Sequence, residues 1–317
     1  MKASFHIRAL LFSVAYTCFS LINAQQHKQE NDTRIDTLGF STDTRLKEIS
    51  GLLFSRKNPS TFWVHNDSGD APVLYALKKD MTIKALFEIE GATHTDWEDI
   101  AQATIEGKNY LFIGDIGDNR AARKSITVYQ VEEPSLDTGS TSKLKVYRTI
   151  ELAYEDGARD AEALLYDSLT NELIVVTKRD KEARVYSAQL DKITTEKTTT
   201  LKFEGTLKLD ALKSDLPPMR TYLHYITAAD QHEDGSVLLK NYFRVWRYTN
   251  SELKPMKQLL TNERPEQLPY QLEQQGEAIA FDLDSNRYYT TSECADDGTS
   301  HIPQPLYRYT LSASRPE

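Results

Sequence analysis

Short apolar stretches separated by turn residues recur along the chain, and an acidic or hydroxyl residue opens most of them. The clearest copy, 96–119, runs out along 98–101 and returns along 110–113. Apolar runs of this length around a glycine-containing turn predict a β-hairpin. The returning strand ends in an acidic loop at 114–119, so its carboxylates should lie beside Glu98, where the hairpin's other strand begins.

Five copies of this hairpin can be aligned, and a third strand containing a tyrosine follows each of them. Counted from Glu48, corresponding positions are separated by 50, 64, 65 and 50 residues. Antiparallel strands repeated at such intervals are typical of β-propeller blades. We therefore predict an all-β, five-bladed β-propeller. A six-bladed propeller is the alternative if 188–222 contains a degenerate unit.

The fifth copy leaves room for only three strands before Glu317, whereas 35–40 is a strand without a blade. We expect this N-terminal strand to complete the last blade and close the ring, because closure removes exposed sheet edges. The segment 35–317 is then one propeller domain.

Residues 1–24 have the features of a secretory signal peptide, with basic residues at Lys2 and Arg8 before an apolar run at 9–22. That run is shorter than the roughly 20 residues that a membrane span needs. The polar segment 25–34 is expected to be a disordered leader. The sequence thus predicts a secreted or periplasmic protein without a membrane span.

Loss of the signal peptide would change the net charge from −9 to −11, because it removes two basic residues. This charge argues against a nucleic-acid polymer as partner and is compatible with cation binding. Cys18 would also be lost, which leaves Cys294 without an internal disulfide partner. We expect a monomer that is stabilised by its core or by a metal ion.

The first strand of each propeller blade lines the central channel, so the residues that open these strands should ring its mouth. These are the predicted metal ligands: Ser50, Glu98, Glu162, Thr227 and Glu277. Three carboxylates in a narrow channel repel one another unless they are protonated or share a cation. Hard oxygen ligands without His or Cys favour Ca²⁺. The alternative is that these side chains cap strand ends by bonding to backbone amides.

A second ring of polar residues follows the second strand of each copy. Its basic and imidazole side chains are candidates for binding an anionic substrate: His65, Lys178, Arg179 and Lys240. Its carboxylates are candidates for orienting a catalytic water: Asp67, Asp115 and Asp118. The alternative is a solvated polar face whose Asp, Asn and Gly residues serve the turns.

The order of short motifs resembles that of the calcium-dependent apyrases, or soluble calcium-activated nucleotidases. The motifs are Ser-Gly-Leu at 50–52, Trp-Glu-Asp-Ile at 97–100, Glu-Ala at 162–163, Thr227 and Gly-Glu-Ala-Ile at 276–279. The resemblance implies a five-bladed propeller whose central Ca²⁺ is held by the five predicted ligands. It also implies that Lys178, Arg179 and Lys240 bind phosphate. The segments GDIGDN and DAEAL are similar to those of secreted bacterial propeller proteins.

Three functions remain open from the sequence. One is a secreted Ca²⁺-dependent hydrolase that acts on a phosphate-bearing or other anionic small molecule. The second is a non-catalytic, Ca²⁺-stabilised propeller that binds a glycan or a protein partner. The third, suggested by the paired carboxylates, is an enzyme that cleaves a polysaccharide.

Overall fold

The computed structural model describes residues 33–136, 141–194, 197–210, 222–296 and 301–312. The predicted signal peptide and most of the predicted leader lie outside these residues. The first strand, β1 (Thr33–Phe40), begins two residues earlier than the sequence analysis expected. The end of the predicted leader is therefore part of a strand.

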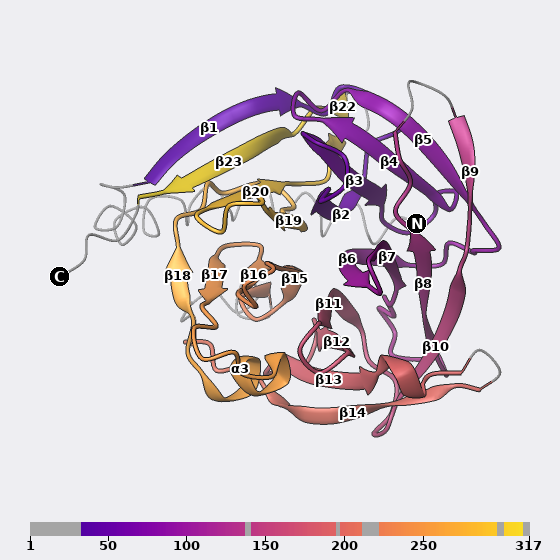
Figure 1. The fold of residues 1–317 in the computed structure, drawn as a ribbon. Coiled ribbons are helices and arrows are strands. Elements are labelled where there is room, and N and C mark those ends of the chain that lie inside the picture. The colour runs from indigo at the N-terminus through magenta and orange to yellow at the C-terminus, as the bar shows by residue number, and fades with distance from the viewer. Residues whose placement is uncertain (1–32, 137–140, 195–196, 211–221, 297–300, 313–317) are drawn as a thin grey trace.

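Sheets of antiparallel strands are arranged around a central axis (Figure 1). Neighbouring innermost strands contact one another, and the last of them contacts the first, so the ring is closed. In chain order they are β2 (Ile49–Phe54), β6 (Trp97–Ile105), β11 (Ala161–Asp167), β15 (Ile226–Gln231) and β19 (Ala278–Phe281). This arrangement is an all-β propeller, as predicted.

The remaining strands add outward from each innermost strand. Outside β2 lie β3 (Thr61–Asn66), β4 (Val73–Lys78), β5 (Ile83–Glu90) and β9 (Thr141–Lys145). Outside β6 lie β7 (Lys108–Asp115), β8 (Ile126–Glu132) and β10 (Arg148–Tyr154). Outside β11 lie β12 (Glu172–Thr177), β13 (Arg184–Gln189) and β14 (Thr199–Thr206).

The last two runs follow the same plan. Outside β15 lie β16 (Val237–Asn241), β17 (Val245–Tyr248) and β18 (Glu266–Leu268). Outside β19 lie β20 (Arg287–Thr291), β23 (Pro305–Leu311) and β1. The short elements are η2 (Leu190–Lys192), α3 (Met256–Asn262), β21 (Ala295–Asp296) and β22 (His301–Ile302).

The innermost strands are buried along their whole length, except for the last two residues of β6, which explains why they read as mostly apolar runs in the sequence. Hydrophobic side chains from neighbouring sheets interlock to form the core. Phe112 of β7 stacks on Tyr166 of β11, with ring centroids 5.7 Å apart. Phe54 of β2 likewise stacks on Tyr289 of β20 at 5.5 Å. These contacts between sheets fix the orientation of the innermost strands around the axis.

The N-terminal strand closes the ring, as the sequence predicted. β1 pairs antiparallel with β23, and a salt bridge of 2.7 Å joins Arg308 to Asp36 across the pair. Figure 1 shows the two strands side by side at the outer edge of the molecule.

Two of the strand pairings are parallel. The chain passes from one sheet to the next between β9, which ends at Lys145, and β10, which begins at Arg148. β9 pairs parallel with β5, and β10 pairs parallel with β14. The second pairing merges two four-stranded runs into one eight-stranded sheet, so the number of blades stays a prediction. The described part of 188–222 supplies β14 and η2.

The predicted all-β fold did not include the short helix α3. This helix contacts β13 and β14 and buries Met256, Leu259 and Leu260 against the adjoining hydrophobic cluster. None of the helices in the described residues has the length and apolar character of a membrane span.

Candidate metal centre

Four of the five predicted metal ligands lie at irregularities in the pairing of the innermost strands. In β6, for example, Trp97 pairs with Asp115 and Asp99 with Gly114, so Glu98 has no partner in the ladder. The other residues in this position are Ser50, Glu162 and Thr227. A bulge turns a side chain out of the alternating pattern of a strand. Glu277 immediately precedes β19 instead.

The two predicted hydroxyl ligands connect neighbouring sheets. Ser50 Oγ donates a hydrogen bond of 2.5 Å to the backbone oxygen of Glu98. Thr227 Oγ1 donates one of 3.0 Å to the backbone oxygen of Gly276. Both hydroxyls are buried, and their hydrogens are used by these contacts. Their oxygens keep lone pairs that could contact a cation.

Lys178 inserts its ammonium among the predicted carboxylate ligands. Its Nζ forms an ion pair with Glu162 Oε1 and lies 3.6 Å from Glu277 Oε1. Burial opposes its charge, but these carboxylates outweigh that effect and raise the Lys178 pKa. Tyr242, which the sequence analysis missed, donates a hydrogen bond of 2.6 Å to Glu277. Lys178 is therefore a buried part of the ring, and its substrate-binding role stays a prediction.

Asp67 joins two groups of carboxylates at the mouth of the channel. In one group its carboxylate oxygen lies within 4.8 Å of oxygens from Asp96 and Glu98, and in the other of oxygens from Glu277 and Glu293. Asp96 and Glu293 were not among the predicted ligands. Asp96 lies two residues before a predicted ligand, and Glu293 follows the second strand of its copy, so the repeat alignment was the signal that could have found them.

Crowding and burial disfavour negative charge in this cluster. Burial, with repulsion from neighbouring carboxylates, raises the pKa values of Glu98 and Glu293 well above the usual range. Burial and the charge of Glu277 raise the pKa of Asp67 to about 7. For Glu277 itself, burial is outweighed by the Lys178 ammonium and by hydrogen bonds from neighbours, so its pKa is lowered. The ammonium of Lys178 contacts Glu162 and Glu277, so the other carboxylates of the cluster have no such positive partner within the described part of the chain.

Gly117 allows the acidic loop to close over this cluster. A Cβ atom at this position would overlap Glu98 Oε1 and Asp96 Oδ2. The backbone N–H of Gly117 also donates to the backbone oxygen of Asp96, at 3.1 Å. The close approach of the loop backbone to these carboxylates therefore requires glycine.

The predicted catalytic residues Asp115 and Asp118 hold the loop in place. Asp115 accepts hydrogen bonds from the backbone N–H groups of Thr95 and Asp96 and from Arg123 Nη1, the last at 2.7 Å. Asp118 accepts the backbone N–H of Arg123, also at 2.7 Å. Both carboxylates are buried. The structure thus gives them structural partners, and their catalytic role stays a prediction.

Arg179 lies at the rim of the cluster, with 35% of its side chain exposed. Its Nε forms an ion pair with Asp160 at 2.5 Å, and its Nη2 donates to Asn119. Its guanidinium also lies 5.2 Å from the centre of the Tyr225 ring. Of the predicted substrate-binding cations, Arg179 is the one that reaches solvent.

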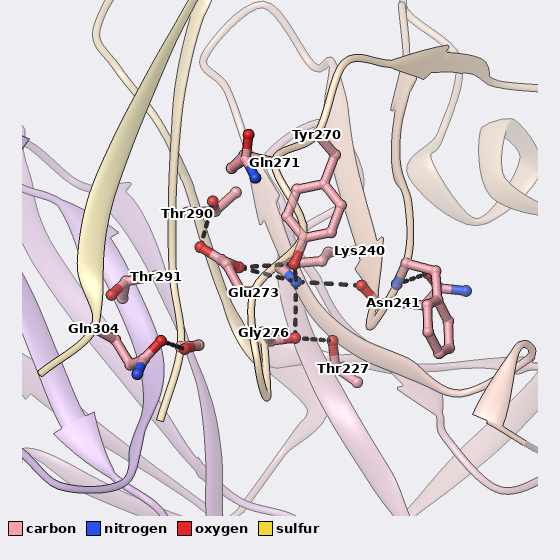
Figure 2. A network of polar contacts seen from close by, with 12 residues as sticks. Thr227, Lys240, Asn241, Tyr270, Gln271, Glu273, Gly276, Thr290, Thr291 and Gln304 are labelled. Carbon is pink, nitrogen blue, oxygen red and sulfur yellow. Dashed lines mark hydrogen bonds and ion pairs between the residues drawn. The ribbon is translucent and has the colours of Figure 1, made fainter. Parts of the chain in front are cut away.

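Lys240 is fully buried and lies in a network of polar contacts (Figure 2). Its Nζ donates to Gly276 O at 2.8 Å and to the Tyr270 hydroxyl at 2.5 Å, and lies 3.4 Å from Glu273 Oε2. Burial lowers its pKa to about 8, although Glu273 opposes this effect. The same carbonyl of Gly276 accepts the Thr227 hydroxyl. Lys240 thereby anchors the segment that leads into β19, and its substrate-binding role stays a prediction.

His65 is buried completely and lies behind the cluster. Its Nδ1 lies 3.0 Å from the backbone oxygen of Asn66, and its Nε2 has no hydrogen-bond partner among the described residues. Burial lowers its pKa to about 4, so the ring is neutral. Its ring packs edge-on against Trp97. A role in binding an anion stays a prediction.

The donor set fits a hard divalent cation. Both groups that share Asp67 consist only of carboxylates. Oε2 of buried Glu162 has no hydrogen-bond partner in the described structure, so it adds an unused oxygen. Oxygen ligands in this number and irregular arrangement suit Ca²⁺, which accepts about 6–8 of them.

No protein-family model and no curated protein matches the chain. Among solved structures it is similar to the major Malassezia sympodialis allergen Mala s 1, with a TM-score of 0.56 and 10% identity, covering 89% of this chain and 98% of that chain. A nidogen/laminin complex matches with a TM-score of 0.43 and 10% identity, covering 90% and 100%. The likeness to Mala s 1 supports the β-propeller fold alone. Neither match supports the resemblance to apyrases.

Proposed function

We propose that the mouth of the channel binds a divalent cation, which we expect to be Ca²⁺. We also propose that the protein hydrolyses a phosphate-bearing or other anionic small molecule at this site. The observation that carries this proposal is the position of Asp67 between two groups of carboxylates. The cation would be held by oxygens of Asp67, Asp96, Glu98, Glu277 and Glu293, with Glu162, Ser50 and Thr227 beside them. The apyrase-like order of motifs agrees with such a site.

Bound Ca²⁺ would supply the positive charge that attracts and polarises phosphate oxygens. The chain's own contribution is to hold the carboxylates together through Lys178 and to present Arg179 at the rim. A guanidinium can bind two phosphate oxygens at once. Of the three predicted catalytic acids, Asp67 is the one in the carboxylate cluster, and we assign to it the orientation of water.

One observation favours the non-catalytic alternative. The charged atoms of Lys178, Lys240, Asp115 and Asp118 all have partners within the protein. In that case the ion would stabilise the ring, and the rim would bind a glycan or a protein partner.

The two functions differ in phosphate release. We expect the purified chain to release phosphate from one or more members of a panel of phosphate esters and anhydrides in Ca²⁺, but not in chelator. Arg179→Gln should reduce this rate by about tenfold or more, because one bidentate contact to phosphate is lost. Arg120→Gln is the matched control, because Arg120 is an exposed arginine directly after the acidic loop.

Each other outcome has a distinct meaning. Ca²⁺ binding without release from any compound would favour the non-catalytic propeller. Release that persists in chelator would contradict the role of the cation. Release that Arg179→Gln and Arg120→Gln reduce equally would contradict the role assigned to Arg179.

We further propose that residues 1–24 are a cleaved export signal and that the mature protein is a secreted or periplasmic monomer. N-terminal sequencing of the exported chain tests the first statement, and its mass in solution tests the second. A mature chain that retains residues 1–24 would contradict export by cleavage.

A further inference from the structure

We propose that the end of the channel opposite the metal centre is a second binding site, for a compact apolar molecule that carries one carboxylate. The innermost strands run from one site to the other. Ser50 lies at the start of β2 and Phe54 at its end, about 13 Å away at ~3.3 Å per residue. The second site is therefore built from different residues and stands independently of the proposed cation.

A pocket of about 240 Å³ opens at this end. Residues at the ends of β2, β15 and β19 line this pocket, together with Gln102 of β6. Drug-sized ligands occupy pockets of roughly 300–1,000 Å³, so this pocket suits a smaller molecule with about one ring.

Polar contacts cross the channel between the two ends. Asp99 Oδ2 of β6 accepts the backbone N–H groups of Leu164 and Ala229, at 2.8 and 3.3 Å. Gln231 Nε2 of β15 donates to Gln102 O of β6 at 2.8 Å. Because β6 and β15 are not neighbours in the ring, these bonds bridge the channel, and a ligand at one end does not reach the other.

Apolar side chains line one part of the pocket, beside polar ones. Phe54 and Phe281 are buried and line it from two innermost strands, while Leu283 is 56% exposed beside them. Aromatic side chains in this setting offer a large area for packing against a flat ligand. The apolar part of the ligand would lie here.

Arg56 is the guanidinium of the pocket, and 15% of its side chain is exposed. Its Nη2 lies 3.4 Å from Gln231 O, and its Nε lies 3.4 Å from Glu233 Oε1. Both contacts are longer than the usual ~2.9 Å for N–H···O bonds. Since a guanidinium has five N–H donors, these contacts leave capacity for a further acceptor.

The acidic residues of the pocket differ in how firmly they are held. Asp282 accepts hydrogen bonds from the Tyr289 hydroxyl at 2.5 Å and from Leu283 N at 2.7 Å, so its carboxylate is occupied. Glu233 is 65% exposed in its side chain and pairs with Arg56 alone among the described residues. Exposed ion pairs of this kind contribute little to stability. Glu233 therefore marks the position that a ligand carboxylate can take over, in bidentate contact with Arg56.

Benzoate and its neutral analogue benzamide test this site, with ligand-observed NMR on the full chain. We expect saturable benzoate binding with a Kd on the order of 1 mM, as for other very small ligands, and benzamide binding at least about tenfold weaker. Arg56→Met should abolish the preference for benzoate. Glu233→Gln should tighten benzoate binding several-fold, because the competing carboxylate is removed.

Lys108→Met is the matched control, since Lys108 is an exposed cation at the same end of the molecule. It should leave benzoate binding unchanged, and chelator should have no effect on any variant. The proposal is overturned if benzoate does not bind saturably or if benzamide binds equally well. Equal affinities in Arg56→Met and Lys108→Met, or binding that depends on Ca²⁺, would also overturn it. Thermal melts of both variants establish that they are folded.

Discussion

At the scale of single residues, the metal centre depends on how closely the acidic loop approaches the channel. Gly117 lies where a Cβ would overlap the carboxylates of Glu98 and Asp96. We predict that Gly117→Ala weakens Ca²⁺ binding about tenfold or more, because both carboxylates must move away from Asp67. Calorimetric titration measures this. Gly107→Ala, in the turn between β6 and β7 at the opposite end, is the control.

An effect of Gly117→Ala on the melting temperature alone, with an unchanged Ca²⁺ affinity, would contradict this account. The clashing atoms are side-chain ends that can shift, so we expect the fold to survive the substitution.

Asp230 provides a test that depends on pH. Burial raises its pKa from 3.8 to about 7, although it accepts the backbone N–H groups of Phe281 and Gln231. The folded chain therefore holds this proton more tightly than the unfolded chain does. The protonated carboxyl of Asp230 therefore contributes its full stabilising effect below about pH 4, and this contribution is lost as the pH rises to 7.

We predict that Asp230→Asn removes this part of the pH dependence. Its free energy of unfolding, relative to the unsubstituted protein, should increase between pH 4 and pH 8 by up to roughly 4 kcal/mol, since one pKa unit corresponds to about 1.4 kcal/mol. Denaturant titrations across this range measure the difference. A difference that stays constant with pH would show that Asp230 does not titrate in this interval.

At the scale of elements, the ring of innermost strands is tied together by side chains that stand in its bulges. Thr227 of β15 donates to the carbonyl that precedes β19. We predict that Thr227→Val lowers stability by about 1 kcal/mol, or roughly 2 °C in melting temperature, through loss of this buried hydrogen bond. Thr104→Val, an exposed threonine of β6, should change stability by less than about half as much. Equal effects of the two would contradict a connecting role.

The sequence predicted the inner strands well because each is buried on both faces and reads as an apolar run that starts at a fixed place. Because these runs start at equivalent places in the repeat, the sequence also predicted that Glu98, Glu162 and Glu277 lie around the mouth of the channel. It did not predict the exchange of β9 to a neighbouring sheet, which depends on tertiary pairing rather than on local pattern. The helix α3 was missed because it has only seven residues, too few to show a period.

The predicted site was less complete than the predicted fold. Asp96 and Glu293 join the carboxylate groups because loops bring them to Asp67, and loop paths are not encoded by strand periodicity. Conversely, Lys178 and Lys240 looked available for an anion in the sequence, but both side chains turn inward to carboxylates. The sequence pattern could not predict whether a side chain that follows a strand points inward or toward solvent.

At the scale of the whole molecule, the ring stays closed through the pairing of the first strand with the last. We predict that a chain beginning at residue 41 loses at least about 5 °C in melting temperature and forms aggregates, because β23 becomes an exposed edge. A chain beginning at residue 33 should behave like the longer protein. Size-exclusion chromatography and thermal melts compare the two, and identical behaviour would argue against a role for β1 in closure.

The central claim is that the carboxylates around Asp67 bind a divalent cation, and calorimetric titration of the metal-free chain with Ca²⁺ tests it most directly. We predict saturable binding that Asp67→Asn weakens by about tenfold to a hundredfold and that Glu106→Gln, an exposed turn residue far from the cluster, leaves unchanged. No saturable binding to the unsubstituted chain, or equal affinities in the two variants, would contradict the claim.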